Sequence, residues 1–176
     1  MRLAGDPVPD PERMIRVDHA GEYGAARIYA GQLAVMGDRA PVSAEIRRMA
    51  AQEASHLETF ERLIVARGVR PTLLHPLWHV AGYALGVVSA LAGPRMAMAV
   101  TAAVETEIDR HYEAQRRALD GEDPELEAVI ARFQADEVAH RDSAIAHGGA
   151  DVPAYPLLSA VIRAGCRAAI RLSERI

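Results

Sequence analysis

Apolar residues recur three and four positions apart over most of the 176-residue chain, which is the spacing of one buried face of an α-helix. Glycine, proline and aspartate separate the stretches that have this spacing. The pattern predicts helices over residues 12–36, 39–67, 77–92, 94–119, 124–147 and 157–174. Asp38 is expected to cap the second helix, with Pro41 in its first turn. Residues 1–11 are proline-rich and lack this period, so we expect a flexible arm before a single domain over residues 12–176.

Glutamate and histidine interrupt the apolar faces of four of these helices. Two faces contain one glutamate, and two contain a glutamate followed three positions later by a histidine, which puts both on one side of a helix. The order repeats after about 84 residues, and the six residues are Glu22, Glu53, His56, Glu105, Glu137 and His140. This arrangement is typical of a di-iron carboxylate bundle. We therefore predict an all-α, ferritin-like four-helix bundle with a long helical crossover and an extra C-terminal helix.

Four carboxylates on buried faces need compensating charge. A buried, unpaired ion costs several kcal/mol, whereas a domain has a net stability of about 5–15 kcal/mol. All the basic residues are arginine, and none lies on these faces. Two divalent metal ions would balance the four negative charges, and two neutral imidazoles would complete the coordination. Oxygen-rich ligands with one histidine per metal favour iron or manganese over zinc or copper.

Other polar residues lie close to these positions in the sequence. Asp18 precedes Glu22 by one turn, so it either orients a ligand at the site or is exposed to solvent. His111 follows Glu105 by six residues and is a second candidate for the surroundings of the site. We expect Glu107 and Asp109 to face water.

Two apolar segments are not needed for a four-helix core. Residues 77–92 are almost entirely apolar but too short to span a bilayer, which takes about 20 residues. They form either a buried crossover helix or a helix in the membrane interface. Arginines recur every four residues in the last helix, at Arg163, Arg167, Arg171 and Arg175. They form either a plain solvated face or a contact with anionic lipid headgroups.

Composition and charge narrow the possible functions. Half of the residues are hydrophobic and only 5% are aromatic, which suits packed helices. A net charge of −4 without a long basic run makes nucleic acid an unexpected partner. The single cysteine, Cys166, excludes an internal disulfide and a cysteine-based zinc site. The first twelve residues do not resemble a signal or transit peptide, so we expect the protein to stay in the compartment where it is made.

Several motifs resemble the demethoxyubiquinone hydroxylase family, di-iron enzymes of ubiquinone biosynthesis. They are RVDHAGEYGA at residues 16–25, RIYAGQ at 27–32, AVE at 103–105, the two Glu-x-x-His motifs, AGCR at 164–167 and LSER at 172–175. The resemblance extends over residues 13–176 and places the family's metal ligands on the same six residues. It also places a His-Tyr pair, His111 and Tyr112, near the metal site. Arg110 departs from the histidine expected there in eukaryotic relatives.

The resemblance implies hydroxylation of the demethoxyubiquinone ring by O₂ at two iron ions. Two electrons would come from an external donor such as NADH, for which the chain has no dinucleotide-binding fingerprint, or from the reduced quinol itself. The isoprenoid tail would be drawn from lipid, with Gly21 and Gly24 leaving room for the ring. We therefore expect a peripheral membrane protein on the cytoplasmic face of a bacterial inner membrane, with a possible lipid-presenting partner protein.

Two other functions are compatible with the same residues. A ferritin-like iron oxidase or storage protein would use the same ligands but assemble as a closed cage. A lipid-binding scaffold would keep its glutamates and histidines free of metal. Assembly size distinguishes the first alternative, and metal content distinguishes the second.

Overall fold

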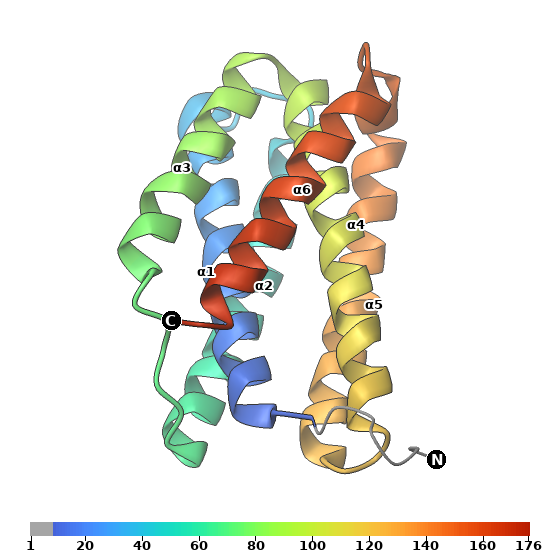
Figure 1. Cartoon of the computed structure of the whole chain (residues 1–176). Coiled ribbons are helices and arrows are strands. Elements are labelled where there is room, and N and C mark those ends of the chain that lie inside the picture. The colour runs from blue at the N-terminus through green and yellow to red at the C-terminus, as the bar shows by residue number, and fades with distance from the viewer. Residues whose placement is uncertain (1–8) are drawn as a thin grey trace.

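The computed structural model describes residues 9–176, and the regular secondary structure of this part of the chain is entirely helical (Figure 1). It contains α1 (Pro11–Met36), α2 (Ser43–Arg67), α3 (His75–Leu91), α4 (Pro94–Leu119), α5 (Pro124–Ala146), the short 3-10 turn η1 (Gly149–Asp151) and α6 (Tyr155–Ser173). The predicted all-α class and the six helices are confirmed. The division into an arm over residues 1–11 and a domain over 12–176 stays a prediction, because residues 1–8 lie outside the described part.

The helices α1, α2, α4 and α5 form the bundle, with α1 packed on α2 and α4 packed on α5. Helix α3 runs along α1 and returns the chain to the end of the bundle where α4 begins (Figure 1). This is the long helical crossover that the sequence predicts. Helix α6 is the additional helix, and it packs mainly on α4. The crossover and α6 therefore cover α1 and α4, two of the helices that carry glutamates of the predicted metal site.

Two helices begin at aspartate caps, and a third expected aspartate cap does not form. Asp10 and Asp123 cap α1 and α5 by accepting from the backbone N–H groups of Arg13 and Leu126, at 2.9 and 3.1 Å. The prediction that Asp38 caps the second helix is wrong. Residues 37–42 form turns, α2 begins at Ser43, and the Asp38 side chain pairs instead with Arg47.

Glycines allow α1 and α3 to approach closely. A Cβ atom at Gly86 would collide with the backbone oxygen of Ile28, and one at Gly82 would lie 2.8 Å from the backbone oxygen of Gly24. At Gly24 itself, by contrast, a Cβ atom would meet nothing within 4 Å. The crossover helix is therefore held to α1 by backbone-to-backbone contact, which only glycine permits.

We expect Gly86→Ala to destabilise the protein by about 1–3 kcal/mol, because the two helices would have to separate. Gly24→Ala is the matched control, since it adds the same methyl group to open space. It should stabilise α1 by up to about 1 kcal/mol, the helix-propensity difference between the two residues. Urea unfolding of both variants measures these changes. Equal effects of the two substitutions would contradict the close packing.

Apolar clusters close the bundle on both sides of its midpoint. One contains Ile15 of α1 with Phe60, Leu119 and Phe133, and the other contains Tyr29 and Met36 of α1 with Ile46 and Met98. Glu22 lies between these two parts of α1. The polar residues of the site are therefore enclosed by apolar packing at both ends.

The expectation that Glu107 and Asp109 face water is wrong. Helix α6 covers this side of α4, and Glu107 is only 7% exposed. Its carboxylate accepts from Arg163 at 3.0 Å and from Arg167 at 2.8 Å. Asp109 is half-buried and pairs with Arg141 of α5 at 2.9 Å. Two of the four periodic arginines therefore hold α6 to α4. The sequence predicted a solvated face or a contact with lipid headgroups, and not this ion pairing.

Candidate metal centre

The structure brings the six predicted residues together in the middle of the bundle, and all six are buried. Their side chains offer two sets of ligand atoms, each with all its atoms within 4.8 Å of one another. One set is Glu22, Glu53, His56 and Glu137, and the other is Glu53, Glu105, Glu137 and His140. Glu53 and Glu137 belong to both sets, so their carboxylates lie where they could bridge two ions. That the six residues bind metal stays a prediction, which this arrangement supports.

Both imidazoles direct Nδ1 into the cluster. His56 Nδ1 lies 3.4 Å from a Glu22 oxygen and 3.3 Å from a Glu137 oxygen. His140 Nδ1 lies 3.1 Å from a Glu53 oxygen and 3.3 Å from the second Glu137 oxygen. Glu137 is thus placed between the two rings, with one carboxylate oxygen toward each.

The atoms that face the centre of this cluster lack hydrogen-bond partners in the described part of the chain. They are Glu22 Oε2, Glu53 Oε1, His56 Nδ1, both Glu137 oxygens and His140 Nδ1. Buried polar atoms are almost always hydrogen-bonded or bound to an ion. Six such atoms that converge from α1, α2 and α5 fit a pair of metal ions, because carboxylate oxygens and neutral imidazole nitrogens are ligands for iron and manganese.

The electrostatics of the protein without metal show the same need for positive charge. Burial, followed by repulsion from Glu137, raises the pKa values of Glu53 and Glu105 well above their usual range. Burial opposes the charge of His56, but its contacts with Glu137 and Glu22 prevail and raise its pKa to about 10. Without metal, the cluster therefore retains protons that divalent ions would replace.

Two buried tyrosines hold the outer sides of two carboxylates. The Tyr112 hydroxyl donates to Glu22 Oε1, and the Tyr29 hydroxyl donates to Glu105 Oε1 at 2.7 Å. Each tyrosine follows the glutamate of its own helix by seven residues and reaches across to the glutamate of the other helix. The resemblance pointed to Tyr112 but not to Tyr29. The internal repeat was the signal that could have identified it.

Two residues that the sequence did not predict accept hydrogen bonds from the Nε2 atoms of the two histidines. His56 Nε2 donates to Asp136 Oδ2 at 3.0 Å, and His140 Nε2 donates to Gln52 Oε1 at 3.1 Å. Gln52 and Asp136 immediately precede the glutamates of the two Glu-x-x-His motifs. Their acceptor oxygens fix both rings with Nδ1 inward, the orientation needed for metal binding.

Asp18 and His111 lie beside the cluster and not in it. Asp18 is 2% exposed, so the solvent-exposed alternative is wrong. It accepts from His111 at 3.0 Å and from Gln115 at 2.8 Å. Asp18, His111 and Tyr112 line a small cavity together with four of the glutamates. The side of the cluster next to this cavity therefore has polar groups that can hold and move protons.

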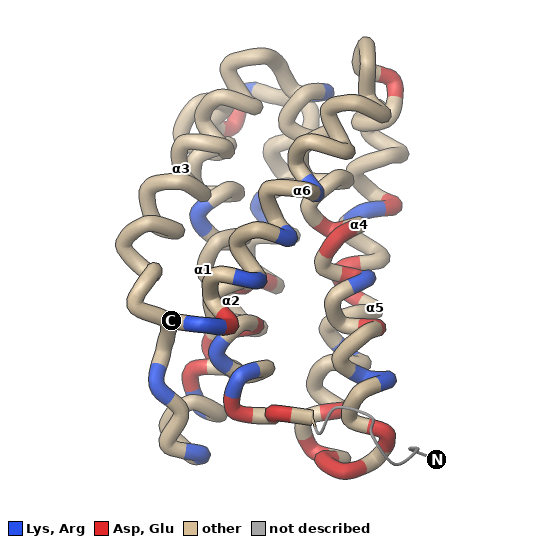
Figure 2. The backbone as a smooth tube through the Cα atoms, in the orientation of Figure 1, with Lys and Arg blue, Asp and Glu red and all other residues tan. Residues whose placement is uncertain are grey.

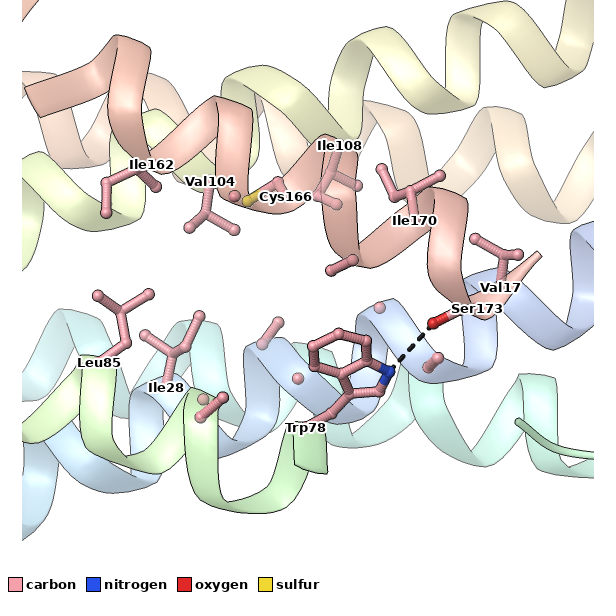
Figure 3. A pocket seen from close by; sticks show the side chains of 18 of the residues that line it. Val17, Ile28, Trp78, Leu85, Val104, Ile108, Ile162, Cys166, Ile170 and Ser173 are labelled. Carbon is pink, nitrogen blue, oxygen red and sulfur yellow. Dashed lines mark hydrogen bonds between the residues drawn. The ribbon is translucent and has the colours of Figure 1, made fainter. Parts of the chain in front are cut away.

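A larger cavity of about 380 Å³ lies between α1, α3, α4 and α6 (Figure 3). Most of its labelled side chains, such as Ile28, Leu85 and Ile162, are apolar and point into it from these helices (Figure 3). Gly21 and Gly24 line this cavity. The sequence predicted that these two glycines leave room for a ligand. Burial raises the pKa of the Cys166 thiol in its wall to about 12, so this group stays protonated.

The two cavities adjoin. Val17, Gly21, Ala25, Ile108 and Ile170 line both of them. At one end of the larger cavity, Trp78 Nε1 donates to Ser173 Oγ at 3.0 Å (Figure 3). Val161, near the other end of the lining of α6, is 61% exposed. The apolar cavity, whose lining includes an exposed residue of α6, therefore adjoins the smaller cavity beside the carboxylate–histidine cluster.

Comparison with known proteins matches nearly the whole chain. The family model for the ubiquinone biosynthesis protein COQ7 matches residues 10–173. The 3-demethoxyubiquinol 3-hydroxylase of Rhodospirillum rubrum is 50% identical over 177 residues, which are 99% of this chain and 84% of the relative.

Eukaryotic relatives are similarly close. The mitochondrial NADPH-dependent 3-demethoxyubiquinone 3-hydroxylase of Mus musculus is 54% identical over 168 residues, 93% of this chain and 77% of the relative. The mitochondrial 5-demethoxyubiquinone hydroxylase of Saccharomyces cerevisiae is 41% identical over 181 residues, 94% of this chain and 78% of the relative. These matches confirm the resemblance found in the sequence motifs, and the chain belongs to the COQ7 family of ubiquinone biosynthesis proteins.

Proposed function

We propose that this protein is a 3-demethoxyubiquinol 3-hydroxylase, a monooxygenase that adds one oxygen atom from O₂ to the quinone ring in ubiquinone biosynthesis. The observation that carries this proposal is the apolar cavity that adjoins the buried carboxylate–histidine cluster. A quinone with an isoprenoid tail needs an apolar space of this kind next to the site that activates oxygen. The names of the relatives support the same reaction.

The residues present fit two iron ions. Glu22, Glu53, His56 and Glu137 would hold one, and Glu53, Glu105, Glu137 and His140 the other. When bound, the iron ions supply the activation of O₂ and the transfer of one oxygen atom to the ring. The four carboxylates balance the charge of the ions, and the two tyrosine hydroxyls hold Glu22 and Glu105 in position.

The surrounding residues bind the substrate and exclude water. The tail would lie along the apolar side chains of α1, α3 and α6, and the ring next to Gly21 and Ile108, which line both cavities. Apolar walls keep bulk water from the cluster, which strengthens its electrostatic interactions. His111 and Tyr112, with Asp18, are placed to hold and move protons at the ring hydroxyls. Electrons would come from an external donor such as NADH or NADPH, or through the quinol.

The face around the cavity is suited to a lipid surface. Helix α3 contains no Asp, Glu, Lys or Arg residue (Figure 2), and Val80, Val88 and Leu91 are largely exposed. Leu157, Val161 and Leu172 expose further apolar surface on α6. Among the described residues, none of the helices has both the length and the apolar character needed to cross a membrane. We propose that α3 and α6 lie on the membrane interface, on the cytoplasmic side of a bacterial inner membrane, and take the substrate from lipid directly or from a lipid-presenting partner protein.

Complementation tests the reaction. Cells that lack their own hydroxylase and accumulate demethoxyubiquinone should make ubiquinone when they express this chain. The Glu22→Ala variant, expressed at the same level, should leave the precursor unconverted. Product quantified by mass spectrometry decides the outcome, and ubiquinone formation by the variant at the wild-type rate would contradict the assignment of the site.

Filling the cavity should block the substrate and spare the metal. Gly24→Leu places a large side chain in the open space beside Gly24, and we expect kcat/KM for a demethoxyubiquinol to fall about 10²-fold because the ring is displaced. Gly24→Ala, which adds only a methyl group, is the control. Iron content measured on both variants should equal that of the wild type. Unchanged kcat/KM in Gly24→Leu would show that the substrate uses another route.

The ferritin-like alternative predicts a different assembly. An iron oxidase or storage protein would form a large closed shell without exposed apolar helices, whereas α3 and α6 expose apolar residues. Gel filtration without detergent distinguishes the two functions. A large soluble shell would contradict the hydroxylase proposal.

A further inference from the structure

The two histidines of the metal centre donate to acceptors of different charge. The acceptor for His56 is the carboxylate of Asp136, at 3.0 Å, and the acceptor for His140 is the amide oxygen of Gln52, at 3.1 Å. Both bonds use Nε2 and leave Nδ1 toward the cluster. The two rings are therefore held in the same way, and only the chemistry of the acceptor differs.

This difference interrupts an otherwise repeated arrangement. Gln52 and Asp136 occupy equivalent positions, each one residue before a Glu-x-x-His motif, and each contacts the histidine of the other motif. The hydrogen bonds from Tyr29 and Tyr112 to opposite glutamates follow the same repeat, and both donors are tyrosine. Among these paired contacts, the acceptors of the two histidines are the pair whose members differ in charge, aspartate in one repeat and glutamine in the other.

A nearby cation increases the contrast. Arg48 Nη1 donates to Gln52 Oε1 at 2.5 Å, so the oxygen that accepts from His140 also accepts from a guanidinium group. This contact also identifies the atom as the amide oxygen, because a guanidinium group can only donate. Gln52 Nε2 in turn donates to Asp136 Oδ1 at 3.4 Å. Negative charge is thus present behind His56, whereas a polarised neutral amide lies behind His140.

The charge of the acceptor affects metal binding through the ring. A hydrogen bond to a carboxylate is roughly twice as strong as one to a neutral acceptor. It makes the imidazole a more basic ligand, and such outer contacts typically change metal affinity by about 10–100-fold.

We propose that Asp136 and Gln52 make the two metal positions unequal, so that the position of His56 fills first and binds about 10–100-fold more tightly than the position of His140. Asp136 and Gln52 act as positioning residues through the two histidines. The inference depends on the metal centre of the proposed function and adds an order of loading to it. Protein supplied with less metal than it can bind would then hold one ion, at His56.

The test is a titration of the metal-free protein with Co²⁺, which is stable in air and gives strongly shifted NMR signals from the N–H groups of ligating imidazoles. The wild type should bind two ions in two steps whose dissociation constants differ about 10–100-fold. The first step should produce one shifted N–H signal, that of His56. The His140→Ala variant should retain this signal, which assigns it.

Exchanging the acceptors should exchange the order. Asp136→Asn should raise the dissociation constant of the first binding step about 10–100-fold, so that the two constants become similar. Gln52→Glu should lower the dissociation constant of the second step. In the double variant, the separation should return with the N–H signal of His140 appearing first. A merely structural role for these residues would not produce this reversal. Asp142→Asn, an exposed carboxylate on the same helix, is the control and should change neither step.

Separate results contradict separate parts of the proposal. Equal constants in the wild type, an equal loss of both steps in Asp136→Asn, or first binding at His140 would overturn the unequal positions and leave the metal centre intact. Co²⁺ binding that is unaffected by Glu137→Gln would overturn the metal centre itself, and with it the proposed function. Gln52→Glu keeps the oxygen that accepts from His140 and removes only the Nε2 donor to Asp136. Tightening of the second binding step in this variant therefore tests the inference if Asp136→Asn unfolds. Circular dichroism of the metal-free variants checks their folding.

Discussion

Glu137→Gln is expected to release both metal ions and to abolish ring hydroxylation. One Glu137 oxygen faces His56 and the other faces His140, and Glu137 belongs to both sets of ligand atoms. An amide of the same shape keeps the packing but lacks the negative charge that would hold two cations. Because the metal supplies several kcal/mol of transition-state stabilisation, activity should fall at least about 10³-fold. Iron content and product formation, measured on the same preparation, check this result.

Asp142→Asn is the matched control, because it makes the same chemical change on the same helix at an exposed side chain that pairs with Arg141. This variant should keep wild-type iron content and activity. Glu137→Ala should behave like Glu137→Gln in both measurements. If Glu137→Gln retained full activity, the assignment of the six residues as metal ligands would be wrong.

The metal-free protein is expected to lose stability as the pH rises from about 5 to 9. Burial raises the pKa values of Glu22, Glu53 and Glu105, so the folded chain retains protons that the unfolded chain has already lost. Stability falls with pH wherever the folded state binds more protons, by about 1.4 kcal/mol per pH unit for each retained proton. We expect the melting temperature of the metal-free protein to fall by more than about 10 °C over this range.

His56 adds to this loss of stability, whereas Glu137 changes its charge only below the stated pH range. The pKa of His56 is raised to about 10, so the stability that its protonated form contributes is also lost as the pH rises toward that value. Burial would raise the pKa of Glu137, but its contacts with His140 and His56 lower it to about 2, so its contribution changes only in acid, below pH 4.5. Metal-loaded protein should show little change over the same range, because the ions replace the protons.

Glu53→Gln should reverse the effect of metal on stability. Without metal at pH 8, this variant should melt at a higher temperature than the wild type, because it has one fewer buried acid. With metal, this variant should melt at a lower temperature than the wild type, because only the wild type binds the ions fully and gains stability from them. Calorimetry of both proteins, with and without a chelator, provides the comparison. A wild-type melting temperature that does not change on chelation would contradict the role of metal in stability.

The four-helix core and its six polar residues could be predicted because both depend on local spacing. Apolar periodicity determines which face of each helix is buried, and a glutamate or histidine on that face must then be buried too. The repeat of Glu22 and Glu53-x-x-His56 as Glu105 and Glu137-x-x-His140 indicated that the helices meet around one site. The structure places all six together.

Contacts between helices distant in sequence could not be predicted in the same way. Glu107 was expected in water because the sequence does not show that α6 lies over α4, where Arg163 and Arg167 reach this carboxylate. Asp38 failed as a cap because the turn after α1 is longer than the spacing suggested. The packing of α6 on α4 determined the partners of Glu107, and the conformation of the turn after α1 determined the partner of Asp38.

By itself, the sequence determined the helical class, the buried faces and the six candidate ligands, because these follow from the period of the helix and the cost of burying charge. Only the tertiary structure decided which residues surround them. Asp136 and Gln52 cross from one repeat to the histidine of the other, and the cavity beside Gly21 forms only where α1, α3, α4 and α6 meet. Such contacts depend on how helices pack against one another, and that packing is set by the shapes of side chains far apart in the chain.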